Sequence, residues 1–248
     1  TQLLEELRYV KDLLIVQDLD GVCIPLVKDP LTRILDCSYI QAASVFGPEF
    51  AVLTNGEHEG RRGVNRLVEK AIGSHGQAAK NGLYLPGLAA GGVELQDKYG
   101  EVSHPGVSPE EFELLVKMPH RMEVSLEQRL VDVFADLDKK AIKHLTKKSI
   151  LDTRLSPTIN LNGIFSLIPG NVRLQRELQG MVLGVMEGLL EKASMEGLTN
   201  SFYLHIAPNL GQEGDHERIK YATSSDIGTT DIQFMINGAR KEVGLLVL

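Results

Sequence analysis

Two aspartates separated by a single residue, Asp18 and Asp20, directly follow a short apolar run and constrain this chain more than any other feature. The run at 13–16 is rich in β-branched residues, which predicts a buried parallel strand. Gly21 then permits a sharp turn out of that strand. Open α/β sheets bind ligands at the carboxyl ends of their strands, and two neighbouring carboxylates require a cation or a shared proton. The pattern therefore indicates a site for a hard divalent cation or, alternatively, two solvated acids at a strand end.

A second apolar run, at 50–53, ends in Thr54, Asn55 and Gly56. A hydroxyl group and exposed backbone N–H groups at a strand end can cradle a phosphate. The same residues also favour a helix N-cap or an Asx turn, so this segment alone does not establish a binding site. Together with the acids at 18–20, it resembles the first two motifs of the haloacid dehalogenase superfamily of phosphohydrolases.

The resemblance implies a role for each of these residues. Asp18 would attack phosphorus, and Asp20 would donate and recover a proton. Thr54 and Asn55 would bind the transferring phosphoryl group. Mg²⁺ would be bound by Asp18 and Asp20, the latter through its backbone carbonyl.

Lys241 lies where the superfamily places the lysine of its third motif, just before a helix of the form K-G-x-A-L-x-x-L. Glu242 stands where glycine is usual, and Arg240 is a competing cation. The chemistry requires a positive charge here, because the aspartate and the phosphoryl oxygens repel one another. The alternative is an exposed lysine at a helix start.

The order of the expected elements predicts an α/β core interrupted by an insertion. Strands at 13–16 and 50–53 alternate with helices within 28–46 and 59–72, which is the start of a doubly wound parallel sheet. From Ser108 onward helical periodicity dominates, with further strands at 202–206 and 232–236. We therefore expect a core formed by 1–107 and 226–248 and an α+β cap at 108–225. The resemblance implies a Rossmann-like haloacid dehalogenase core with a type-2 cap.

Composition excludes some partners but does not identify a substrate. The formal net charge of −7 argues against nucleic acid or an anionic membrane as the main partner. No apolar run approaches the length of a membrane-spanning helix. The two cysteines, Cys23 and Cys37, lack metal-site spacing and fit a reducing compartment. We interpret Cys23 as a small core residue rather than as a reactive thiol.

Longer segments resemble one family, the glucosylglycerol-phosphate phosphatases. The similar segments are 16–23, 53–58, 82–93, 207–211 and 228–235, and the run at 82–93 is far more specific than D-x-D-G. This cyanobacterial family dephosphorylates glucosylglycerol 3-phosphate to make an osmolyte, a response to salt stress. The resemblance implies a Mg²⁺-dependent phosphatase in the cyanobacterial cytoplasm or the chloroplast stroma.

The resemblance leaves the substrate open. The small-molecule partner would be a sugar phosphate, and sucrose phosphate or another glycosyl phosphate is an alternative to glucosylglycerol phosphate. His205, Asn209 and Asp231 are candidates for contacts with the sugar, although a structural role explains each of them as well.

The two ends of the chain bear on the expected activity. It begins at Thr1 rather than Met and stops within the apolar run 243–248, so we interpret both ends as cut and the core as truncated. The family continues to an acidic fourth motif that completes the magnesium site. Without it, Asp18 and the Asp20 carbonyl are few ligands for an octahedral ion, and we expect little phosphatase activity. A natural end near Leu248 would instead favour a non-catalytic subunit whose exposed apolar surface is covered by a protein partner.

Overall fold

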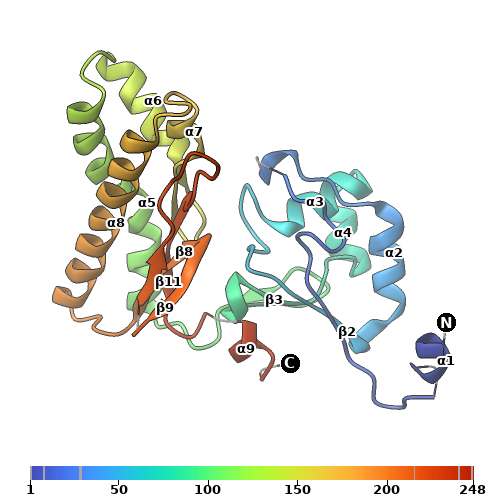
Figure 1. The fold of residues 1–248 in the computed structure, drawn as a ribbon. Helices are drawn as coiled ribbons and strands as arrows, with labels where there is room; N and C mark the ends of the chain where they lie inside the picture. Colours follow the sequence, from blue (N-terminus) through green and yellow to red (C-terminus); the bar gives the residue numbers. More distant parts are fainter. Residues whose placement is uncertain (1, 8, 28–29, 215, 240, 247) are drawn as a thin grey trace. The chain divides into compact units, whose positions relative to one another are not determined.

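A computed structural model describes residues 2–7, 9–27, 30–214, 216–239, 241–246 and 248. The chain forms two compact units, shown as a ribbon in Figure 1. The first unit comprises Thr1–Gly106 and Gly238–Leu248, and the second comprises Val107–Asn237. Among the described residues, every helix is too short or too polar to span a bilayer.

The first unit contains a five-stranded sheet in the order β1-β2-β3-β4-β5. Strands β1 (Ile15–Gln17), β2 (Phe50–Leu53) and β3 (Gly87–Ala89) pair in parallel. Strands β4 (Glu94–Gln96) and β5 (Val102–Ser103) continue the sheet in antiparallel pairing. The parallel-rich sheet confirms the predicted α/β class, and β2 forms where its apolar run predicts it.

Short helices complete the first unit. They are α1 (Gln2–Leu7), α2 (Cys37–Val45), α3 (Val64–Ile72), α4 (His75–Asn81) and α9 (Lys241–Gly244), with 3-10 turns η1 (Pro30–Thr32), η2 (Gly47–Glu49) and η3 (Ala90–Gly92). Helix α3 buries Val64, Leu67 and Val68, which recur at helical spacing, in the same core as Val52 of β2. The side chain of Asp36 caps α2 by accepting the Ser38 N–H. The parallel pairing of β1 with β2 places the carboxyl ends of the two strands next to each other.

The second unit is an antiparallel sheet with two long helices packed against it. Its elements are α5 (Pro109–Val133), α6 (Lys139–Ser149), β6 (Ile150–Leu151), β7 (Thr158–Asn160), α7 (Asn162–Phe165), α8 (Val172–Met195), β8 (Phe202–Ala207), β9 (Asn209–Glu213), β10 (His216–Ile219) and β11 (Asp231–Ile236). The main sheet has the order β6-β7-β11-β8, and β9 and β10 form a separate hairpin. Figure 1 shows α5 and α8 running along one side of β8 and β11. Ser108 and Glu111 form a capping box at the start of α5, which confirms the predicted helix start.

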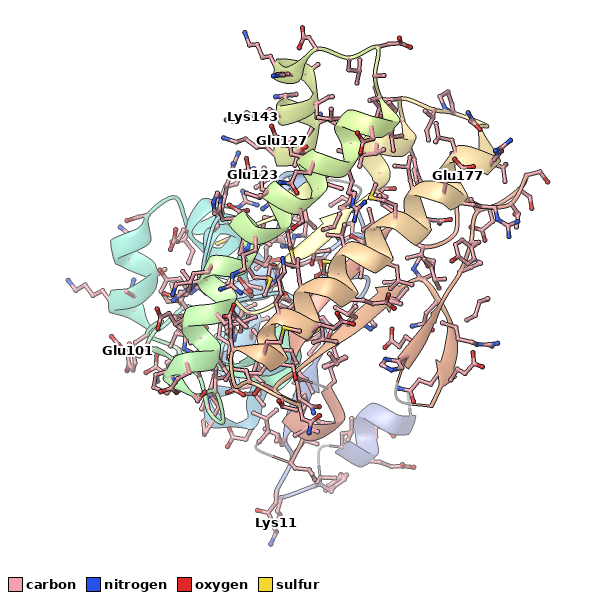
Figure 2. All side chains as sticks on the ribbon, turned by 90° about the vertical axis from the view of Figure 1, so that its left-hand side faces the viewer. Lys11, Glu101, Glu123, Glu127, Lys143 and Glu177 are labelled. Carbon is pink, nitrogen blue, oxygen red and sulfur yellow. The ribbon has the colours of Figure 1, made fainter. Side chains whose placement is uncertain are left out.

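The outer faces of α5 and α6 are charged. Lys143 of α6 lies near Glu123 and Glu127 of α5 (Figure 2). The ammonium group of Lys147 is 4.0 Å from a carboxylate oxygen of Glu123. A solvated face of this kind explains the lysine-rich sequence of α6.

Strand β11 belongs to the second unit, whereas the sequence pattern predicts that residues from 226 onward belong to the core. It pairs with β8 from Asp231 to Ile236 and also with β7. Ile232 and Phe234 are fully buried in the second unit. An alternating apolar pattern predicts a strand with one buried face but does not specify which sheet it joins, and this explains the misplaced boundary.

Candidate active site at the ends of the first two strands

Asp18 and Asp20 follow β1 on either side of Leu19, which is fully buried. Anchoring of Leu19 in the core leaves both aspartates partly exposed at the strand end. The turn closes as the Gly21 N–H donates to the Ile24 carbonyl at 2.7 Å, and Gly21 has a φ of +83°. That conformation strains residues with a Cβ, so the structure confirms the predicted turn.

Asp20 is bound by an arginine that the motifs do not include. Arg33 Nη1 donates to both carboxylate oxygens of Asp20 at 3.0 Å, and Nη2 donates to the Arg62 carbonyl. Only 9% of the Arg33 side chain is exposed. A buried guanidinium is retained where it is paired and hydrogen-bonded. Arg33 therefore ties the loop after β1 to the loop after β2.

Thr54 lies at the carboxyl end of β2 and is almost completely buried, whereas Asn55 is exposed. The Thr54 Oγ1 accepts a hydrogen bond from the Gly56 N–H at 3.2 Å. A Cβ built on Gly56 would lie 3.6 Å from Thr54 Oγ1 and 3.9 Å from both Arg33 Nη1 and Asp20 Oδ2. The structure thus brings the predicted hydroxyl and the second aspartate to one place.

Lys241 is the first residue of α9, and its ammonium group is 2.7 Å from Asp18 Oδ2. The other oxygen of Asp18 accepts the Leu19 N–H at 2.8 Å. The predicted lysine and the predicted nucleophile are therefore in contact, although 223 positions of sequence separate 18 from 241. The competing cation, Arg240, lies outside the described residues.

The donors present match Mg²⁺ in type but supply few ligands. Asp18 and Asp20 offer hard oxygen atoms, which Mg²⁺ prefers. Both carboxylates are also in contact with a cation, Lys241 or Arg33. Within the described ranges, no group of three or more histidine, cysteine, aspartate or glutamate side chains is placed to hold a metal ion. Mg²⁺ commonly fills its remaining coordination positions with water and substrate phosphate. Asp18 and Asp20 therefore fit the ion as part of its ligand set.

The three candidates for contacts with the sugar belong to the second unit. In the second unit, His205 Nδ1 is 2.9 Å from Glu217 Oε1, and Asn209 Nδ2 donates to Glu217 Oε2 at 2.9 Å. Asp231 accepts hydrogen bonds from Asn160 and Thr230, each at 2.8 Å. These bonds explain the three candidates as parts of the fold of that unit.

Cys23 is half-buried in the first unit. Burial raises the pKa of its thiol, which disfavours the reactive thiolate.

The sheet is rich in parallel pairing, and Asp18, Asp20 and Thr54 follow neighbouring strands of it. These features place the chain in the haloacid dehalogenase superfamily, as the motifs predict. Within that superfamily it belongs to the glucosylglycerol-phosphate phosphatase family, whose model matches residues 12–248. It is 45% identical over 245 residues to a protein named glucosylglycerol-phosphate phosphatase from a Synechocystis species. The alignment covers 98% of this chain and 58% of the relative, so the chain spans less than two thirds of the relative's length.

Proposed function

We propose that this chain carries the phosphoryl-transfer residues of a phosphatase that acts on glucosylglycerol phosphate through an aspartyl-phosphate intermediate. The observation that carries the proposal is the 2.7 Å contact between the Asp18 carboxylate and the Lys241 ammonium group at the end of β1. A nucleophilic carboxylate must approach an anionic phosphate, and a lysine beside it offsets their repulsion. Membership of the family supports the substrate class.

The chemistry requires two displacements at phosphorus. In the first, an Asp18 oxygen forms a bond to phosphorus while the ester P–O bond breaks, and Asp20 gives its proton to the departing alcohol oxygen of the substrate. In the second, Asp20 takes a proton from water as the water oxygen attacks phosphorus and the bond to Asp18 breaks. Inorganic phosphate is released, and the Asp18 carboxylate and the Asp20 proton are both restored.

The remaining residues bind and orient the phosphoryl group. Thr54, the N–H groups that follow it and Lys241 would stabilise the equatorial oxygens. Arg33 holds Asp20 in place through two contacts at 3.0 Å. Mg²⁺, held by Asp18 and the Asp20 carbonyl, would supply electrostatic screening between the nucleophile and its anionic substrate. A reducing compartment such as the cyanobacterial cytoplasm suits the two free cysteines.

The test is phosphate release from a panel of esters by the complete protein in the presence of magnesium. The panel contains glucosylglycerol phosphate, sucrose phosphate, glycerol phosphate and p-nitrophenyl phosphate. We expect the highest kcat/KM for glucosylglycerol phosphate, loss of activity on chelation and recovery on addition of Mg²⁺. Equal or better turnover of an unrelated ester would contradict the substrate assignment and leave the chemistry standing. Turnover that persists after exhaustive chelation would contradict the role of the metal.

A further inference from the structure

The glycine-rich segment Gly87–Glu94 overlaps the run at 82–93, whose resemblance to the family is far more specific than that of D-x-D-G, yet it contributes none of the reacting groups. It forms β3, η3 and the first residue of β4. Its backbone is folded tightly: Ala90, Gly91 and Gly92 all have positive φ values, of 49°, 68° and 109°. A conformation of this kind persists where the surrounding contacts demand it.

The contacts of this segment are made to the loop that carries Thr54. Thr54 donates its N–H to the Leu88 carbonyl at 3.0 Å and accepts the Gly91 N–H at 3.1 Å. The Ala90 N–H donates to the Gly56 carbonyl at 2.6 Å. The backbone of Gly87–Glu94 therefore holds both ends of the turn from Thr54 to Gly56.

Glu94 fixes the next part of the same loop with its side chain. It is fully buried, and its Oε1 accepts the N–H of His58, while the N–H of Glu59 also donates to the carboxylate. In the part of the chain that the structure describes, Oε2 has no hydrogen-bond partner, and His104 Nε2 lies 3.6 Å from it. A buried carboxylate costs free energy unless backbone or cationic groups satisfy it. The N–H groups of His58 and Glu59 offset part of this cost for the Glu94 carboxylate.

The segment also contacts the residues that lead to Lys241. A Cβ built on Gly91 would lie 2.6 Å from the Ala239 carbonyl oxygen, and one built on Gly244 would lie 3.1 Å from the Gly92 Cα. Only glycine allows this approach of the two backbones. Gly87–Glu94 thus supports, from one side, both elements that would bind the phosphoryl group.

We propose that Glu94 is a positioning residue, which holds the loop from Thr54 to Glu59 in its phosphate-binding conformation through the N–H groups of His58 and Glu59. The inference rests on the proposed function, and it adds a residue that touches neither the substrate nor the reacting atoms. An ionised carboxylate accepts N–H bonds more strongly than a neutral acid does. The loop is therefore held more firmly when Glu94 is charged than when it is protonated.

The charge of Glu94 changes within an accessible pH range. Its pKa is raised to about 7: burial is the largest cause, the charges of Glu57 and Glu59 act in the same direction, and the N–H bonds from His58 and Glu59 oppose them. The titratable groups that face it are Glu57, His58 and Glu59 from the loop and His104 from the segment after β5. Burial lowers the pKa of His58 to about 4, so that its imidazole remains neutral near pH 7. Its ring is held by the Gly87 carbonyl at 3.1 Å and the Gln96 amide at 3.2 Å.

Amide resonances of this chain, followed between about pH 5.5 and 8.5, report the positioning role without reference to turnover. We expect the His58 and Glu59 amides to shift together with a midpoint near the Glu94 pKa of about 7. Glu94→Gln keeps the size of the side chain and removes its charge, so both titrations should vanish. Glu101→Gln changes an exposed residue of the β4–β5 hairpin, labelled in Figure 2, and should leave them intact. His104→Gln should shift the midpoint without removing the titration. Amides that do not titrate, or that titrate equally in Glu94→Gln, would overturn the proposal.

Inorganic phosphate, added to the same labelled proteins at pH 8, separates this inference from the proposed function. We expect phosphate to shift the amides of residues 54–56, with a Kd about five-fold weaker in Glu94→Gln than in the unmodified chain or Glu101→Gln. Equal phosphate affinity in all three proteins would overturn the positioning role. If no protein responds to phosphate while the His58 and Glu59 amides still titrate through Glu94, the proposed function fails and the link between Glu94 and the loop stands.

Discussion

The loop after β2 has carboxylates on two sides, and their surroundings are opposite. On the reactive side, Asp20 is 34% exposed and contacts a guanidinium. On the supporting side, Glu94 is fully buried and binds backbone N–H groups. A carboxylate that exchanges protons with a substrate must be reachable and charge-balanced, whereas one that only holds a loop needs neither. Under the two proposals, the same functional group reacts in one region and supports the loop in the other.

Asp18→Asn should show the largest effect on the reactive side. The amide is a poor nucleophile and no longer attracts Lys241, so we expect phosphatase activity of the complete protein to fall by about four orders of magnitude. Asp12→Asn makes the same chemical change on an exposed residue before β1 and should leave the rate unchanged. Steady-state phosphate release measures both variants, and trapping by fluoroberyllate tests for the acyl-phosphate. A variant at Asp18 that retains substantial turnover would exclude the covalent route.

Arg33→Met should have a smaller effect, because it misplaces Asp20 without removing it. We expect kcat to fall about 100-fold with little change in KM, since acid–base groups contribute about two to four orders of magnitude when well placed. Arg33→Lys should recover part of kcat. A lysine keeps the charge, but its ammonium group cannot bond to both Asp20 and the Arg62 carbonyl as the planar guanidinium group does.

Arg173→Met is the matched control for Arg33. Arg173 pairs with Glu177 four residues along α8, and its side chain is 91% exposed. Exposed pairs of this kind contribute little, so kcat should stay at the unmodified value. An unchanged kcat in Arg33→Met as well would show that Asp20 does not depend on its arginine.

Residues that belong to a short local motif were the ones that could be predicted, including Lys241, which is distant in the sequence from Asp18. The apolar run at 50–53 and the Ser108 helix start depend on local patterns, and the structure confirms both. Asp18, Asp20 and Thr54 lie in short motifs directly after strands, so the placement of these side chains at strand ends follows from the strands alone. Their chemical roles remain predictions.

Arg33 and Glu94, which reach the site through tertiary contacts and belong to none of the motifs, were missed. Arg33 precedes α2 in a loop without periodicity, and nothing local relates it to Asp20. Glu94 leaves a weak signal, an acid between the apolar residues Val93 and Leu95 just after two glycines. The sheet that β11 joins also depends on long-range pairing, which alternation along one strand does not encode.

Glu94→Gln should show the smallest of the three effects, and it appears in stability rather than in chemistry. Burial raises the pKa of Glu94 to about 7 from an ordinary value of 4.5. The folded chain therefore binds an extra proton between these values, so the stability from this group is fully present below pH 4.5 and is lost as the pH rises through 7. A shift of this size corresponds to about 3 kcal/mol as an upper bound. Because the new amide must itself find partners, we expect the variant to gain about 2 kcal/mol relative to the unmodified chain at pH 8.

Chemical denaturation at a series of pH values measures this gain. The stability difference between Glu94→Gln and the unmodified chain should grow between pH 4.5 and 7 and then level off, because the glutamine cannot ionise. Glu101→Gln should give a flat difference near zero, since the residue is exposed. A stability difference that does not change with pH for Glu94→Gln would mean that Glu94 titrates as an ordinary acid. The surroundings of Glu94 and Asp20 would then not differ in the way proposed. A gain in stability above pH 7 together with weaker phosphate binding would instead show that the chain keeps a costly buried charge because the phosphate loop needs it.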